Sequence, residues 1–131
     1  MRLVIALSLL VSVVAAPAAA QSEAQVSILG TENLRTVCSD NSNGYSAGLN
    51  SGFCIGFVRA VFERMFVEGV ILHDQDARLP DPGKCLPSYI TNEFLVMIVK
   101  DRLKAQPEER GFAFDFVERT FKNSFPSCLI R

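Results

Sequence analysis

Residues 51–70 have the sequence SGFCIGFVRAVFERMFVEGV, and their pattern determines the fold class. The apolar residues recur at i, i+3 and i+4, the spacing that places them on one face of a helix. They are Phe53, Cys54, Phe57, Val58, Val61, Phe62, Met65 and Phe66. The charged residues lie on the other side, where Arg59 with Glu63 and Arg64 with Glu68 are spaced to pair at i, i+4. The pattern predicts a long amphipathic helix and not a membrane span.

Shorter segments precede and follow this helix. Leu34 and Val37, at i and i+3, predict a short helix over residues 31–39. Residues 40–50 are rich in Asn, Ser and Gly, and residues 73–87 contain three prolines. Because these residue types favour turns, we expect both segments to be loops.

The C-terminal part of the chain predicts two further helices. Residues 91–106 form the third main helix, with Thr91 as its N-cap. Pro107 begins the fourth at its first position, where a missing N–H costs nothing. The stripe of the fourth helix is Phe114, Val117, Phe121 and Phe125. We therefore predict an all-α fold, a small four-helix domain with one short and three longer helices.

The first twenty residues precede this domain. A short positive start, Met1-Arg2, is followed by the apolar residues 3–16 and by three alanines at 18–20. This is the layout of a secretory signal peptide. The apolar run of about 14 residues is too short to span a bilayer comfortably. We expect residues 1–20 to be cleaved, leaving residues 21–131 as a single helical domain in the periplasm.

The cysteines agree with that location. Four cysteines, an even number, suit a disulfide framework in an exported domain and allow three connectivities. An antiparallel hairpin of the third and fourth helices, turning at Gln106-Pro107, would bring Cys85 near Cys128. Cys38 ends the first helix, and Cys54 lies in the first turn of the second. We predict Cys38–Cys54 and Cys85–Cys128. A zinc site is the alternative, but the chain has no Cys-x-x-Cys and a single His.

Charge and residue content exclude several function classes. With 13 basic and 14 acidic residues, the chain has no basic excess to neutralise phosphates, so we expect no nucleic-acid partner. A nucleophilic enzyme would need a free thiolate or a hydroxyl beside a base, and His73 is the only imidazole. A pair of carboxylates remains possible from sequence alone, but nothing marks one. We expect no catalysis, no cofactor and no metal.

The charged loop is the candidate partner-binding surface. Residues 72–84 are long, charged and anchored by the disulfide that we predict at Cys85, so the loop would lose less entropy on binding. Its candidate contacts are His73, Asp74, Asp76, Arg78, Asp81 and Lys84. The alternative is an ordinary solvated connection. A metal site at His73, Asp74 and Asp76 is disfavoured against a merely polar loop.

Two other features have structural or interaction roles. The run from Phe94 to Val99 is apolar on all sides and is either a central core helix or a homodimer surface. Gly56 lies within the long helix, where glycine costs about 1 kcal/mol, so we expect it to allow close packing of another segment.

The order of several short motifs resembles the Rap/Tai family of type VI secretion immunity proteins. The motifs are Cys38, Phe53-Cys54-Ile55-Gly56-Phe57, Cys85-Leu86-Pro87, Pro107-Glu108-Glu109-Arg110 and Phe125-Pro126-Ser127-Cys128. The resemblance covers about residues 29–128. Phe57 stands where the family has Tyr, Ser127 is inserted before the last Cys, and Ile90-Thr91 lacks the usual Gly-Val-Thr.

The resemblance implies a binding function. Such proteins are helical, disulfide-bonded and often dimeric, and a loop protrudes into the active-site groove of a secreted peptidoglycan amidase. We therefore expect a periplasmic immunity protein whose partner is a cell-wall amidase effector, with no membrane partner after signal cleavage. The alternatives are a small periplasmic helical chaperone or stress protein, or a housekeeping protein with no toxin partner.

Overall fold

The computed structural model describes residues 29–39 and 44–129, which form five helices and no β-strand. The helices are α1 (Thr31–Ser39), α2 (Tyr45–Gln75), α3 (Pro82–Cys85), α4 (Asn92–Ala105) and α5 (Ala113–Ser124). The predicted all-α fold is confirmed, with α3 as one additional short helix. The expected signal peptide lies outside the described residues. No helix in the described ranges is long and apolar enough to cross a membrane.

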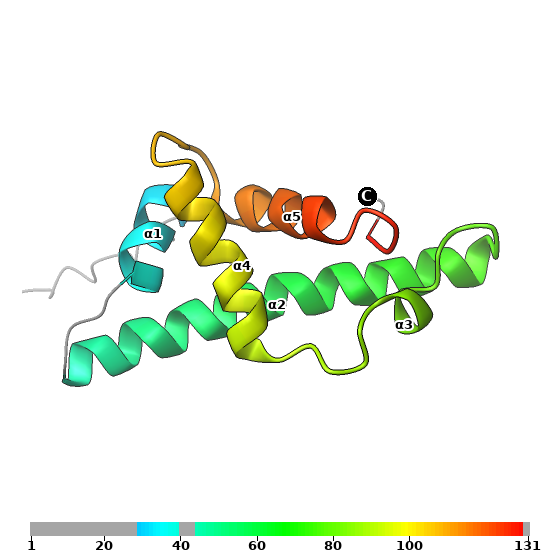
Figure 1. Ribbon diagram of the computed structural model, residues 1–131, viewed down its shortest axis with the longest axis horizontal. Helices are drawn as coiled ribbons and strands as arrows, with labels where there is room; N and C mark the ends of the chain where they lie inside the picture. Colours follow the sequence, from blue (N-terminus) through cyan, green and yellow to red (C-terminus); the bar gives the residue numbers. More distant parts are fainter. Residues whose placement is uncertain (1–28, 40–43, 130–131) are drawn as a thin grey trace, which may run out of the picture.

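The long helix α2 runs the length of the molecule, and the other helices lie along it (Figure 1). It is longer at both ends than the 51–70 segment predicted. Gly44 precedes it with φ 115°, in the left-handed region that glycine adopts readily. The expectation of a loop over residues 45–50 is therefore wrong. At the other end the N–H of Asp76 donates to the carbonyl of Leu72 at 2.9 Å, which closes the last turn.

The predicted apolar face of α2 forms the centre of the core. Cys54, Val58, Val61, Phe62 and Met65 are buried there. Phe121 of α5 packs edge-on against Phe62, with 5.3 Å between ring centroids. Of the remaining predicted stripe members, Phe57 and Phe66 are partly buried, and Phe53 is 49% exposed. The core therefore forms between the middle of α2 and the helices that cross it.

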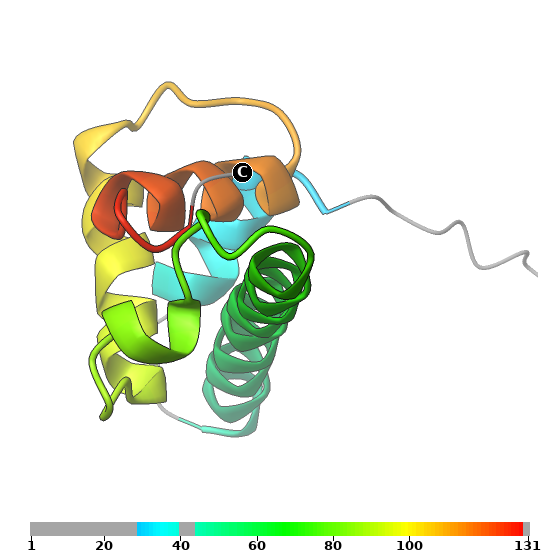
Figure 2. The same cartoon turned by 90° about the vertical axis from the view of Figure 1, so that its right-hand side faces the viewer.

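The α4–α5 pair is not the predicted antiparallel hairpin. The two helices cross steeply in both ribbon views (Figures 1 and 2), and residues 106–112 form the connection. Pro107 is therefore not the first residue of α5, which begins at Ala113. The end of this connection and the first residue of α5 are hydrogen-bonded instead to the backbone at Leu29 and Thr31. The N–H of Thr31 donates to the carbonyl of Gly111 at 2.8 Å, and that of Ala113 to Leu29 at 2.9 Å.

Both predicted disulfides are present, Cys38–Cys54 and Cys85–Cys128. The second forms by a different route from the one expected. Cys85 ends α3, seven positions before α4 begins at Asn92, and the turn after α5 brings Cys128 back to it. Disulfides of this kind indicate an oxidising environment outside the cytoplasm.

The predicted N-cap of α4 is confirmed, because the Thr91 hydroxyl accepts a hydrogen bond from the N–H of Phe94 at 3.2 Å. Beyond the cap, the apolar run divides by exposure. Leu95 and Val99 are buried, whereas Phe94 is 39% and Met97 49% exposed. The run is therefore not a central core segment on all its sides.

The close approach expected at Gly56 occurs elsewhere. A Cβ at Gly56 would meet nothing within 4 Å, so that prediction is wrong. A Cβ at Gly69 would lie 2.6 Å from Cγ of Pro82. Gly69 thus lets α3 pack directly on α2, and it positions the loop between them.

Candidate functional site

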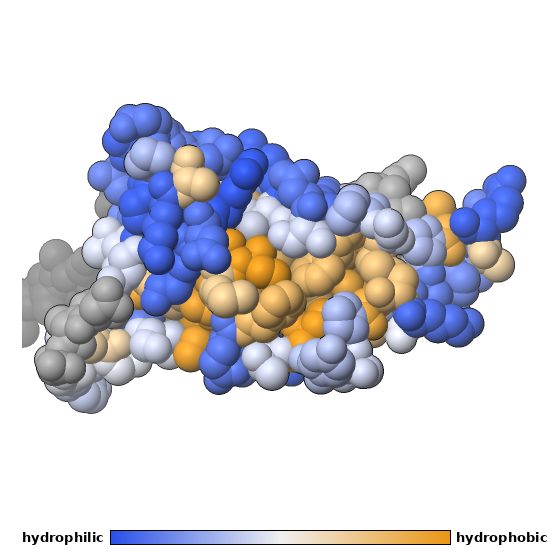
Figure 3. Space-filling model, viewed as in Figure 1, coloured by the Kyte–Doolittle hydropathy of each residue, from blue (hydrophilic) through white to orange (hydrophobic). Residues whose placement is uncertain are grey.

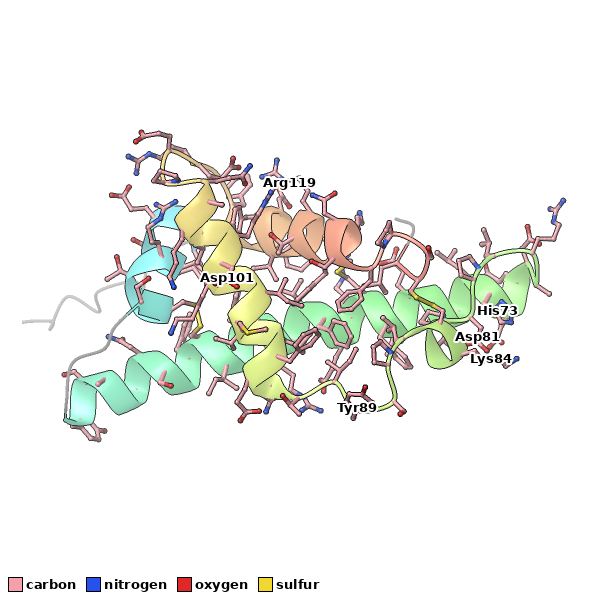
Figure 4. All side chains as sticks on the ribbon, viewed as in Figure 1. His73, Asp81, Lys84, Tyr89, Asp101 and Arg119 are labelled. Carbon is pink, nitrogen blue, oxygen red and sulfur yellow. A yellow bond between two sulfur atoms is a disulfide. The ribbon has the colours of Figure 1, made fainter. Side chains whose placement is uncertain are left out.

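The candidate loop lies at one end of the molecule, beyond the C-terminal turn of α2. Figure 2 views the molecule from this end, with the loop and α3 nearest to the reader. His73, Asp81 and Lys84 lie together there in Figure 4, whereas Asp101 of α4 and Arg119 of α5 lie far from it. The predicted loop over residues 73–87 is only partly right, because α2 continues to Gln75 and α3 spans Pro82–Cys85.

The turn after α2 is held by Asp76 and Arg78. The Arg78 guanidinium donates to both carboxylate oxygens of Asp76, from Nε at 2.9 Å and from Nη2 at 2.8 Å. The backbone N–H of Arg78 donates to the same carboxylate at 3.1 Å. These bonds stabilise the ionised form and lower the pKa of Asp76 below its ordinary value of 3.8, with the side-chain bond as the larger cause. The turn is therefore structured by its own side chains.

The other side of the loop is held in the same way. Nδ1 of His73 lies 2.7 Å from the carbonyl oxygen of Leu79 and must carry the proton, because a carbonyl only accepts. Asp81 caps α3 by accepting from the N–H of Gly83 at 2.9 Å. Its second oxygen lies 3.4 Å from Nζ of Lys84. Both ends of the loop are thus bonded to the helices that they join.

Two contacts anchor the base of the loop. Pro82 is fully buried against Gly69, and Cys85 is bonded to Cys128. A short loop with internal bonds and a covalent anchor is ordered before any partner arrives, so little conformational entropy remains to be lost on binding. The loop is a preorganised protrusion and not a free tether.

The six predicted residues are not one cluster. Asp76 pairs with Arg78 and Asp81 with Lys84, while Asp74 is exposed and His73 bonds to the backbone. Within residues 29–39 and 44–129, no group of three or more His, Cys, Asp or Glu side chains is placed to hold a metal ion.

A pocket that the sequence pattern did not predict lies beside the loop. It has a volume of about 120 Å³ and lies between α2, the loop and the turn after α5. Its apolar lining includes Met65, Leu72, Leu79, Pro80 and Leu129. The Cys85–Cys128 prediction already implied that the C-terminal turn returns to this loop, and that was the signal available for it.

One charged residue, Glu68, lines the same pocket and is exposed. The predicted Arg64–Glu68 pair is wrong, because the Arg64 guanidinium lies over the ring of Phe114, 4.7 Å from its centroid. By contrast, the predicted Arg59–Glu63 pair forms at 2.6 Å. In the part of the chain that the structure describes, Glu68 has no ion-pair partner.

A second surface feature is apolar. The face in Figure 3 carries an apolar area in its middle, with hydrophilic side chains at the upper left over α4 and at the right-hand end. Exposed large apolar side chains also occur on the first turns of α2, at Tyr45, Leu49 and Phe53. The hydrophilic loop end and the apolar surfaces therefore offer chemically different contacts.

This end of the molecule thus combines an internally bonded loop, an adjoining apolar pocket and the carboxylate of Glu68 at the pocket. Comparison with protein-family models, with curated proteins and with solved structures finds no match to this chain.

Proposed function

We propose that this chain is a periplasmic immunity protein that binds a type VI-secreted peptidoglycan amidase and blocks its active-site groove. The observation that carries the proposal is the loop over residues 76–81, which protrudes, is bonded internally and is anchored by the Cys85–Cys128 disulfide. The motif order that resembles the Rap/Tai family supports the same function. The protein acts by occupying the groove in stoichiometric amounts, without catalysis or a cofactor.

The physical reason for a rigid loop is the form of the target. A peptidoglycan amidase has a groove that accepts an extended substrate, and steric blockade requires a protrusion that keeps its shape inside it. Arg78 is the most accessible charged group of the loop, with its side chain 90% exposed. We therefore place Arg78 and its neighbours in the contact.

The direct experiment is an inhibition titration. Purified, oxidised protein lacking residues 1–20 is added to a type VI peptidoglycan amidase, and hydrolysis of peptidoglycan is followed as the molar ratio rises. We expect activity to fall to zero at a fixed stoichiometry. Undiminished hydrolysis at a large excess, across amidases from the host and its neighbours, would contradict the proposal.

A matched pair of variants locates the contact. Arg78→Glu reverses a charge in the loop, and Arg110→Glu reverses one in the connection between α4 and α5. Each arginine forms one exposed ion pair, Arg78 with Asp76 and Arg110 with Glu32 at 2.6 Å. We expect Arg78→Glu to weaken inhibition about tenfold or more and Arg110→Glu to leave it unchanged. Equal effects would place the contact elsewhere.

We place a homodimer contact, if the protein forms one, on the exposed side of α4 at Phe94 and Met97. The alternative function, a helical chaperone, is favoured by the exposed apolar side chains of Tyr45, Leu49 and Phe53. Acid-dependent binding of apolar dyes, together with absence of amidase binding, would support the chaperone. Absence of both activities would support a housekeeping protein without a toxin partner.

A further inference from the structure

We propose that the pocket beside the loop binds one aliphatic side chain of a partner protein, flanked by a lysine or arginine that pairs with Glu68. The inference rests on the proposed function in one respect: the partner is the protein that the loop engages. It adds the chemistry of the contact, because it states which residues that protein presents.

The size of the pocket limits the occupant. Its volume of about 120 Å³ is close to that of the ~150 Å³ apolar cavity that accepts benzene in another protein. A Leu, Ile or Met side chain has a suitable size. Burying such a side chain raises affinity about tenfold or more, enough to make it an anchor of the interface.

The lining determines the polarity of the occupant. Met65 and Leu72 come from α2, Leu79 and Pro80 from the loop, and Leu129 from the turn after α5. These are apolar side chains from three separate segments. The pocket therefore selects an apolar group that is small enough to enter between them.

Glu68 determines the charge next to that group. It is exposed, it lines the pocket, and Arg64, its expected partner, lies over Phe114 instead. Asp76 and Asp81 at this end are paired with Arg78 and Lys84, and Asp74 does not line the pocket. Glu68 thus leaves a negative charge at the pocket that a basic residue of the partner complements.

The pocket is also continuous with the candidate loop, because Leu79 and Pro80 belong to both. A partner that contacts the loop therefore passes the pocket. This position distinguishes it from the open apolar surfaces of α2 at Val67 and of α4 at Met97, which neither Leu79 nor Pro80 lines.

The test uses three capped dipeptides and no amidase. Acetyl-Lys-Leu-amide, acetyl-Glu-Leu-amide and acetyl-Lys-Ala-amide are titrated into the full oxidised mature chain, and methyl NMR signals of Met65, Leu72, Leu79 and Leu129 are followed. We expect the Lys-Leu peptide to shift these signals with an affinity about tenfold higher than that of the Lys-Ala peptide. The Glu-Leu peptide should bind more weakly than the Lys-Leu peptide.

Variants at an exposed helical position keep the fold and change only the charge. Glu68→Gln should lower the affinity for the Lys-Leu peptide about threefold, the effect expected from losing one solvent-exposed ion pair. Glu68→Lys should reverse the preference, so that the Glu-Leu peptide binds better. Asp101→Lys is the matched control: it reverses an exposed acidic residue of α4 and should leave the preference unchanged (Figure 4).

Three results would overturn the inference. The first is no shift of the four methyl signals at millimolar peptide, and the second is equal binding of the Lys-Leu and Glu-Leu peptides. The third is binding only after Ile130 and Arg131 are deleted, which would make the protein's own C-terminus the occupant. Because no amidase is present, a clear Lys-Leu preference beside a failed inhibition titration would reject the proposed enzyme and keep the pocket.

Discussion

Two glycines of α2 show how the surroundings of a residue decide its role. Gly56 and Gly69 both lie inside the helix, where glycine is about 1 kcal/mol less favourable than alanine. A Cβ at Gly56 would meet nothing within 4 Å, whereas one at Gly69 would lie 2.6 Å from the ring of the buried Pro82. Only Gly69 gains a packing contact in return for its helical cost.

Gly56→Ala should therefore raise the free energy of unfolding by about 1 kcal/mol, and Gly69→Ala should lower it. Urea denaturation of the two oxidised variants measures both changes on one scale. The Gly69→Ala change should also disturb NMR signals of the loop and α3, which Gly56→Ala should not. If both variants were stabilised equally, α3 would not pack on α2 at Pro82.

Asp76 carries the second prediction at the scale of single residues. Arg78 lowers the pKa of Asp76 in the folded state. The pairing therefore contributes to the stability of the fold above the ordinary pKa of 3.8, and this stability is lost as the pH falls through the lowered pKa. A carboxyl NMR titration should give a pKa for Asp76 below 3.8. Arg78→Gln should raise that pKa, and Arg110→Gln should not. An unchanged pKa in Arg78→Gln would mean that the turn is not held by this pair.

At the scale of elements, the start of α4 depends on Thr91. Thr91→Ala removes the hydroxyl that accepts from Phe94, and we expect a loss of about 1 kcal/mol of stability. The pKa of Glu93 is lowered first by its own backbone N–H and then by Thr91, so it should rise in this variant. Thermal unfolding gives the first quantity and NMR titration the second. Thr91→Ser should retain both properties, and a similar loss in that variant would argue against capping.

The sequence pattern predicted α1 and α4 closely and α5 poorly, for one reason. Thr91 marks the start of α4 through a bond within its own first turn, and such a local signal is legible in the sequence. The start of α5 depends on backbone pairing of residues 111–113 with residues 29–31, some 80 positions earlier. Pro107 and the two glutamates after it are residues typical of a helix start. With the distant pairing in place, however, α5 begins at Ala113.

At the scale of the whole molecule, the disulfides are a large part of the stability. They close loops with sequence separations of 16 and 43 residues. In the chain-entropy model these contribute about 3 and about 4 kcal/mol. Replacing Cys38 and Cys54 together, or Cys85 and Cys128 together, with alanine should reduce the free energy of unfolding by these amounts. Chemical denaturation without reductant measures the losses.

The two double variants should also differ in function. Loss of Cys85–Cys128 frees the base of the loop and should abolish amidase inhibition at a temperature where the chain remains folded. Loss of Cys38–Cys54, at the other end of the core, should preserve inhibition under the same conditions. If both variants inhibited equally well, the disulfide at the base of the loop would not be needed for binding.

The sequence by itself determined the all-helical fold class, the buried face of α2 and the cap of α4. Each follows from periodicity or from a bond within one turn. The cysteine pairing was predicted correctly, but the prediction of Cys85–Cys128 relied on a helical hairpin that does not form. Only the tertiary structure decided where α5 begins, how α4 crosses it, which glycine is packed and that a pocket adjoins the loop. These depend on how separate segments of the chain come together: Pro82 lies against Gly69, and Leu72 and Leu129 line the same pocket. Glu68 is a further example. Its spacing predicted an ion pair with Arg64, but the Arg64 guanidinium lies over the ring of Phe114 from α5.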